Sequence, residues 1–179
     1  MRATALLALS LAASLGVAPP APDPASADEQ LVRRWVERWN GLGGTPGAAD
    51  ALVELYAPDA LHITGPNPDQ RGTATYRGHD GIRALAAKVA DEQEKLAWRI
   101  ETETANDKTA TLVHVAAGPW GGPSVAVQLV EVYTDKASGK RWLVPGAGFF
   151  QVADGKIRRL RLYMADGERV EVEPDRKRP

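Results

Sequence analysis

The spacing of apolar residues divides the chain into a helical first half and a strand-rich second half. Residues 31–39 and 48–56 repeat apolar side chains at helical spacing. A third helix is predicted from the GHDGI turn onward, over 78–96. Because a proline disfavours helix at the residue before it, Pro58 should end the second helix at Ala57.

After Ala97 the period of the pattern changes to two, which is typical of strands. Turn signals, such as GPWGGP at 118–123 and Asp154-Gly155, separate the alternating segments. Strands are therefore predicted at 61–64, 73–76, 98–103, 110–117, 125–134, 141–152 and 156–164. Helices followed by consecutive strands predict an α+β domain whose sheet is an antiparallel meander.

Three segments carry a family resemblance: LYAPDALHI at 55–63, YRGHDGIRAL at 76–85 and FFQVADGKIRRLRLYM at 149–164. Their order and spacing, over about 30–170, resemble the NTF2-like superfamily and, within it, the SnoaL-like group that includes ketosteroid isomerases. The resemblance implies a cone, in which three N-terminal helices pack on a strongly curved, mainly antiparallel sheet. It also implies a cavity for a small, largely apolar molecule, and a homodimer formed through the outer faces of the sheets.

The first 27 residues are typical of a secretory signal peptide. A positively charged start is followed by an apolar run, and an A-x-A cleavage site stands at 25–27. The alternative is a disordered, Ala/Pro-rich leader on a cytosolic protein. We expect export to the periplasm or the medium, with the SnoaL-like domain at 28–172 and a disordered tail at 173–179.

Composition argues against several kinds of function. The 22 lysines and arginines almost balance the 23 aspartates and glutamates, so the chain lacks the field that draws proteins to nucleic acid or anionic lipid. The apolar N-terminal run is too short to span a membrane. There is no cysteine, and the three histidines follow no metal-binding spacing. We therefore expect no disulfide, metal or cofactor, no nucleic-acid partner and no membrane span.

Three positions that the resemblance assigns to ketosteroid isomerase chemistry hold other residue types. That chemistry needs a carboxylate base and donors that hold the oxyanion. By motif, the tyrosine of the first helix falls at Trp35, the base at Thr64 and the acid before the FF pair at Gly148. An indole donates only one hydrogen bond, and a threonine is no base near neutral pH. The sequence therefore predicts a domain without the isomerase catalytic set.

Four tryptophans lie at core-facing positions of the predicted elements: Trp35, Trp39, Trp98 and Trp142. They either fill the core or form an aromatic wall for a flat apolar ligand, because tryptophan often keeps part of its ring accessible. Gly148 either bends its strand or leaves room for that ligand.

Three titratable side chains are candidates for chemistry. Tyr56 lies on the apolar stripe of the predicted second helix, with its hydroxyl expected at the cavity edge. His62 alternates with Ile63, so one of the two faces inward, and the pattern leaves open which. His114 lies among small residues in mid-strand and is compatible with a core, surface or pocket position.

The last predicted strand alternates arginine with leucine. We expect Leu160 and Leu162 to face the core and Arg159 and Arg161 to face away from it. The alternative places one arginine in the cavity, where it would hold an anionic head group.

These observations support three hypotheses: an exported small-molecule-binding domain, an isomerase, lyase or hydrolase with an unrecognised catalytic set, and a homodimeric protein-interaction module of the cell envelope. His114, Tyr56 and His62 are the candidates for a catalytic role. The residues predicted to line the pocket are Trp35, Trp39, Tyr56, His62, Thr64, Trp98, His114, Trp142 and Gly148.

Overall fold

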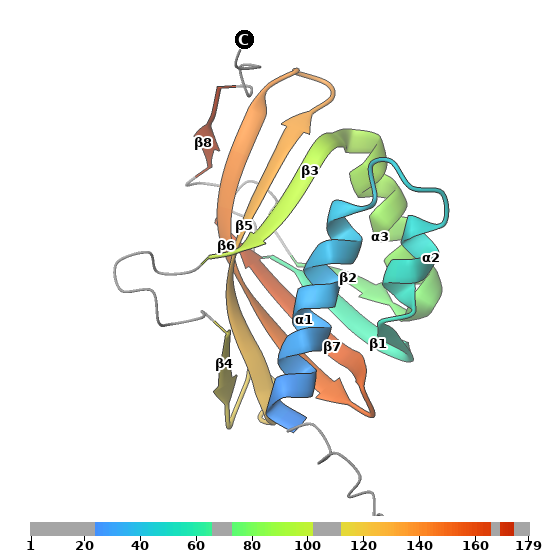
Figure 1. The fold of residues 1–179 in the computed structure, drawn as a ribbon, viewed down its shortest axis with the longest axis vertical. Helices are drawn as coiled ribbons and strands as arrows, with labels where there is room; N and C mark the ends of the chain where they lie inside the picture. Colours follow the sequence, from blue (N-terminus) through green and yellow to red (C-terminus); the bar gives the residue numbers. More distant parts are fainter. Residues whose placement is uncertain (1–23, 66–72, 102–111, 166–168, 174–179) are drawn as a thin grey trace, which may run out of the picture.

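The computed structural model describes residues 24–65, 73–101, 112–165 and 169–173. Within these ranges, three helices lie on one side of a curved sheet of eight strands (Figure 1). The helices are α1 (Pro24–Asn40), α2 (Ala48–Val53) and α3 (Gly78–Glu92). The strands are β1 (Tyr56–Thr64), β2 (Ala74–Arg77), β3 (Gln93–Ile100), β4 (Leu112–Val115), β5 (Ser124–Asp135), β6 (Arg141–Ala153), β7 (Lys156–Met164) and β8 (Val170–Glu171).

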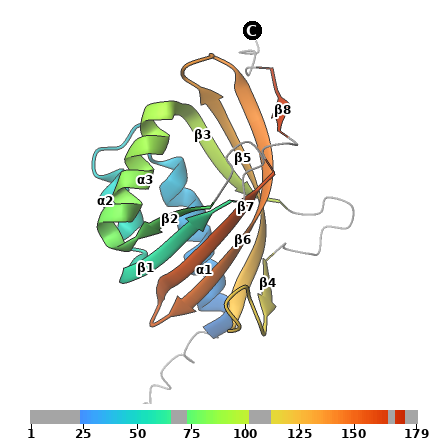
Figure 2. The same ribbon diagram turned by 180° about the vertical axis from the view of Figure 1, so that it is seen from behind.

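The sheet is open and mixed. Its strands follow the order β2-β1-β7-β6-β5-β3, with β4 paired to β5 and β8 paired to β6. Among the described strands every pair is antiparallel except β1 with β7, which run parallel. Seen from behind, the sheet again curves toward the helices (Figure 2). This arrangement confirms the predicted α+β class with helices on a mainly antiparallel sheet, but the parallel β1–β7 pair departs from a simple meander.

Two element boundaries differ from the sequence prediction. Tyr56 begins β1 instead of ending a helix, because it pairs with Ile157 of β7 and Pro58 favours extended backbone before it. Gln93 starts β3 instead of continuing α3, with φ −123° and ψ 147°, and it pairs with Asp135 of β5. In both places strand pairing overrides the helical spacing of the apolar residues.

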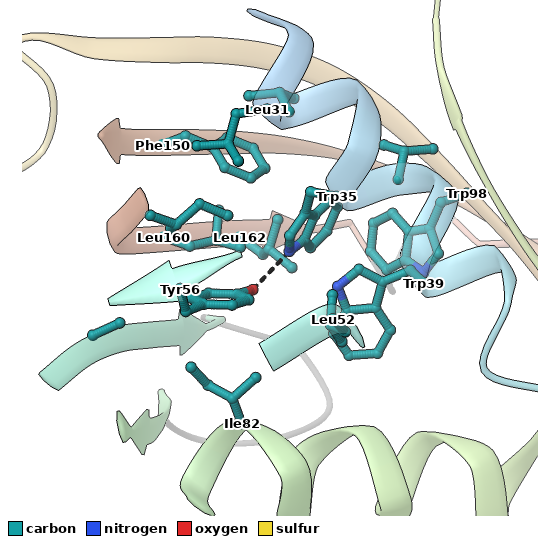
Figure 3. Close-up of a cluster of buried hydrophobic side chains, with 14 of the residues drawn as sticks. Leu31, Trp35, Trp39, Leu52, Tyr56, Ile82, Trp98, Phe150, Leu160 and Leu162 are labelled. Carbon is teal, nitrogen blue, oxygen red and sulfur yellow. Dashed lines mark hydrogen bonds between the residues drawn. The ribbon is translucent and has the colours of Figure 1, made fainter. Parts of the chain in front are cut away.

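The core lies between α1 and the concave face of the sheet. Trp35 is fully buried there, and its ring makes edge-to-face contacts with Trp98 and Phe150, with centroids 5.5 and 5.2 Å apart (Figure 3). Such contacts stabilise a core beyond the burial of area alone. On β7, Leu160 and Leu162 are buried, which confirms the predicted core face of this strand.

The arginines of β7 stack on aromatic rings. The guanidinium of Arg159 lies 5.9 Å from the ring centroid of Trp120, and that of Arg161 lies 4.8 Å from the ring centroid of Tyr163. Since the alternate residues of this strand form the core, these arginines occupy the other face of the sheet.

Residues 1–23 and 174–179, which include most of the predicted signal peptide and tail, lie outside the described residues. Because α1 begins at Pro24, cleavage after Ala27 would remove its first four residues. The predicted strands at 98–103 and 110–117 are described only to Ile100 and from Leu112. In the described part of the chain, no helix is long and apolar enough to cross a membrane.

Candidate functional site

A cavity of about 320 Å³ lies between α3, the end of α1 and the concave face of the sheet. This volume is within the range of sites that bind small molecules. Eight of its sixteen lining residues are aromatic or aliphatic: Trp39, Tyr76, Leu85, Val89, Trp98, Tyr133, Leu162 and Met164.

Polar and charged side chains complete the wall, which makes it more polar than the sequence suggested. They are His62, Thr64, Lys88, Glu92, Gln93, Glu131, Asp135 and Arg169. Glu131 is only 8% exposed. Hydrogen bonds from Ser138 lower the pKa of Asp135, so this carboxyl group is charged at neutral pH.

Behind the cavity, a chain of hydrogen bonds links α1 to β1. The Trp35 Nε1–H donates to the Tyr56 hydroxyl over 2.6 Å (Figure 3), and the same oxygen lies 3.0 Å from His62 Nδ1. All three side chains are fully buried. The backbone carbonyl of Tyr56 lies 3.1 Å from His79 Nε2, so α3 also holds the start of β1. These contacts fix the imidazole of His62 at the cavity wall.

Burial shifts the pKa values of His62 and Tyr56 in the directions that disfavour the charged form of each side chain. It lowers the pKa of His62 from the ordinary 6.5 to about 3, so the imidazole is neutral at neutral pH. Burial also raises the pKa of Tyr56 above its ordinary value of 10, against the effect of the hydrogen bond from Trp35. The indole N–H of Trp39 also acts to lower the pKa of the Tyr56 hydroxyl, although the two groups are not within hydrogen-bonding geometry.

The last residue of α1 holds a second wall residue in place. The Asn40 side chain donates from Nδ2 to the Trp98 carbonyl over 3.0 Å and accepts from the Trp98 backbone N–H over 2.5 Å. The amide thus pairs with β3 as a neighbouring strand would, and it positions the Trp98 indole against the cavity.

Several residues of the cavity wall carry buried polar atoms that have no hydrogen-bond partner among the described residues. Five buried polar side-chain atoms lack a partner in the described part of the chain, and four of them belong to wall residues. These four are Trp39 Nε1, His62 Nε2, Gln93 Oε1 and Trp98 Nε1. Buried polar groups in proteins are almost always satisfied by protein, water or ligand. Four of the five unpaired atoms thus belong to residues that line one cavity.

The structure brings four of the nine predicted pocket residues to the cavity wall: Trp39, His62, Thr64 and Trp98. Trp35 and Tyr56 do not line the cavity, since both are buried behind it and bond to each other. His62, left open by the strand pattern, faces inward.

Three predicted pocket residues lie away from this cavity. His114 is on β4, its side chain is 40% exposed, and its Nε2 lies 3.7 Å from the carboxylate of Glu29 on α1. Trp142 lies on β6, with its ring 4.5 Å from the guanidinium of Arg169. A Cβ on Gly148 would come within 2.9 Å of the Phe150 ring, so this glycine allows close packing and leaves no room for a ligand.

The positions that the resemblance assigns to isomerase chemistry provide no base. Thr64 lines the cavity without a carboxylate, and the N–H of Trp35 is engaged by Tyr56. The described wall residues that carry carboxylates are Glu92, Glu131 and Asp135. None of them stands at a position that the resemblance assigns to the isomerase chemistry. No group of three or more histidine, aspartate or glutamate side chains in the described ranges could hold a metal ion.

Gln93 and Glu131 line the cavity although neither was predicted from the sequence as a pocket residue. The helix predicted through residue 96 hides the role of Gln93, which reaches the cavity because β3 starts there. Glu131 interrupts the apolar run VAVQLVEVY of β5, and an acid within such a run is a signal that could have found it.

Three helices on one side of an open, curved sheet, with a cavity between the layers, define the NTF2-like class of α+β folds. The family model described as "SnoaL-like domain" matches residues 32–160. The chain therefore belongs to the SnoaL-like domain family. No curated protein has a sequence that matches this chain.

Solved structures share this fold at low sequence identity. SalBIII, an epoxide hydrolase/cyclase-like enzyme of pyran ring formation in salinomycin, is similar with a TM-score of 0.61 and 18% identity over 83% of this chain and 98% of that chain. A proposed SnoaL-like polyketide cyclase from Jannaschia sp. CCS1 has a TM-score of 0.59 and 18% identity over 82% of this chain and 91% of that chain. A protein with a ketosteroid isomerase-like fold from Catenulispora acidiphila DSM 44928, in complex with trimethylamine, has a TM-score of 0.58 and 18% identity over 76% of this chain and 85% of that chain. At this identity the likeness establishes the fold alone.

Proposed function

We propose that this domain binds a small molecule with a largely apolar body in its cone cavity and lacks the ketosteroid isomerase catalytic set. The observation that carries the proposal is the set of buried polar atoms without a partner among the described residues, on the wall residues His62, Gln93 and Trp98. Aromatic and aliphatic wall residues suit the body of the ligand, while these polar atoms would fix its orientation.

Native mass spectrometry tests this proposal on protein purified without denaturation from the cells that naturally make it. We expect a bound mass that is released when the protein unfolds. The variant Val89→Trp fills the cavity from α3 and should lose that mass. The matched control Val113→Trp, at a 57% exposed position on β4, should keep it. A wild-type protein without bound mass, or equal binding by both variants, would contradict the proposal.

A second candidate function is an isomerase, lyase or hydrolase reaction with a different catalytic set. It is favoured by Glu131, a residue that is 8% exposed and lines the same cavity as His62. A carboxylate beside an apolar wall is the type of base that removes a proton next to a carbonyl. Solvent deuterium exchange into the position next to the carbonyl of 1-tetralone, followed by NMR, tests for this activity. Glu131→Gln should abolish the exchange and Asp135→Asn should preserve it; no exchange by wild-type protein removes this candidate.

We also propose export through a cleaved signal peptide. The A-x-A site at 25–27 supports it. Intact-mass measurement of the protein from the envelope or the medium should give a chain that begins at Asp28. A chain that retains the leader and stays in the cytosol would contradict export.

A homodimer through the outer face of the sheet is a further proposal. An apolar groove on this face is lined by residues of β5 and β6 such as Ala126, Ala147 and Phe149, beside the exposed Val113. Light scattering should give the mass of two chains for the wild type and of one chain for Ala147→Asp. A wild-type monomer at high concentration would contradict the proposal.

A further inference from the structure

The hydrogen bonds behind the cavity determine which nitrogen of His62 carries the proton. An indole N–H can only donate, so the Tyr56 oxygen accepts from Trp35. The phenol has one proton of its own, and within the described residues the acceptor that lies against it is His62 Nδ1, 3.0 Å away. The phenol therefore donates to Nδ1.

The opposite assignment would leave a buried proton without an acceptor. If Nδ1 carried a proton, the Tyr56 oxygen would accept from both Trp35 and His62, and its own proton would point into a fully buried region. Buried donors without acceptors are rare in folded proteins. Because the pKa of His62 is lowered to about 3, the doubly protonated ring is also disfavoured at neutral pH. The neutral imidazole with its proton on Nε2 leaves one buried group of the three side chains unpaired, Nε2 itself, whereas the Nδ1 form leaves two, the Tyr56 hydroxyl proton and Nε2.

His62 Nε2 is buried, lacks a partner in the described part of the chain, and belongs to a residue of the cavity wall. We propose that His62 presents a neutral Nε2–H donor to the cavity, and that the bound molecule offers it an oxygen acceptor, as a ketone carbonyl does. This inference rests on the proposed function, which it narrows to a class of ligand. The Nε1–H of Trp98 is a second unpaired donor in the same wall, and Gln93 Oε1 is an unpaired acceptor for a ligand hydroxyl or N–H.

The assignment also limits what His62 does for bound ligands. An Nε2 that already carries a proton has no lone pair for a general base, so it binds and polarises an oxygen instead. Tyr56 acts through His62 as a positioning residue, because its hydroxyl holds the tautomer. Any proton abstraction in this cavity would require another group, of which the buried Glu131 is the one identified above.

The first part of the test reads the tautomer in the free protein. Uniformly ¹⁵N-labelled histidine gives three sets of ring signals, and long-range ¹H–¹⁵N correlations distinguish protonation at Nδ1 from protonation at Nε2. The variants His79→Gln and His114→Gln identify two of the sets, and the remaining set belongs to His62, whose own side chain and contact with the Tyr56 hydroxyl are unchanged in both variants. We expect protonation at Nε2. Protonation at Nδ1 would overturn the inference whether or not any ligand binds.

The second part compares 1-tetralone with tetralin, the same bicycle without a carbonyl. One hydrogen bond gained in the site should make wild-type protein bind the ketone about five- to tenfold more tightly. Tyr56→Phe should reduce this preference while tetralin binding changes little, and Tyr163→Phe, on the outer face of β7, should keep it. If both compounds bind wild-type protein equally, the proposed function stands and this inference fails. If both fail to bind at their solubility limit, support for the proposed function is lost, and with it the claim for an oxygen-bearing ligand.

Discussion

Removal of the Tyr56 hydroxyl perturbs the hydrogen-bonded chain behind the cavity most cleanly. In Tyr56→Phe the ring still fills its buried place, but Trp35 Nε1–H loses its acceptor at 2.6 Å and His62 Nδ1 loses its donor at 3.0 Å. Each buried polar group left without a partner costs about 1–3 kcal/mol. Because the imidazole can change tautomer and recover part of its loss, we expect the free energy of unfolding to fall by about 2–4 kcal/mol.

Urea unfolding at pH 7.5, followed by tryptophan fluorescence and circular dichroism, measures this change. The matched control is Tyr76→Phe, since Tyr76 lines the same cavity but takes no part in the hydrogen bonds among Trp35, Tyr56 and His62. We expect the control to stay within about 0.5 kcal/mol of the wild type. Equal unfolding free energies for the two variants would refute the view that the buried chain holds α1 and β1 together.

Three further predictions concern His62, Asn40 and Gly148. The pKa of His62 is lower in the folded chain (about 3) than the ordinary 6.5, so the unfolded chain binds more protons within this window and stability falls as pH falls through it. Relative to pH 7.5, wild-type protein at pH 4.5 should lose about 2–3 kcal/mol more than His62→Gln in urea unfolding, and parallel losses would contradict the buried neutral imidazole. Asn40→Ala removes both side-chain hydrogen bonds to the Trp98 backbone and should lower the free energy of unfolding by about 1–3 kcal/mol. Asn40→Asp should be intermediate because it keeps the acceptor. Equal stability of Asn40→Ala and wild type would show that these two hydrogen bonds do not stabilise the fold. Gly148→Ala should destabilise by about 1–3 kcal/mol through overpacking against Phe150, whereas Gly43→Ala, with open space around it, should show no comparable loss in thermal unfolding.

The chain's pattern was sufficient for the class of fold and for most strands. Leu160 and Leu162 alternate with arginines so regularly that the core face of β7 follows from period two alone. The start of β1 at Tyr56 and of β3 at Gln93 could not be predicted in this way. Both residues continue a helical pattern, and only pairing with distant strands, at Ile157 and Asp135, makes them extended.

The site was predictable by residue type more than by arrangement. Trp39 and Trp98 reach the wall because tryptophans at core-facing positions surround the interior. The bond between Tyr56 and His62 depends on the bend of β1 and its parallel pairing with β7, and no local spacing encodes it. The strand pattern left open whether the side chain of His114 faces the core, the surface or the pocket. In the structure β4 pairs only along part of β5, and the side chain is 40% exposed.

The crystal structure of the protein with bound 1-tetralone tests the central claim most directly, because it shows both the occupant of the cavity and its contacts. We predict that the bicycle lies between α3 and the sheet, with its oxygen about 2.7–3.2 Å from His62 Nε2. A cavity that holds only water at saturating ligand, or a bicycle bound with its oxygen turned away from His62 and Trp98, would contradict the account.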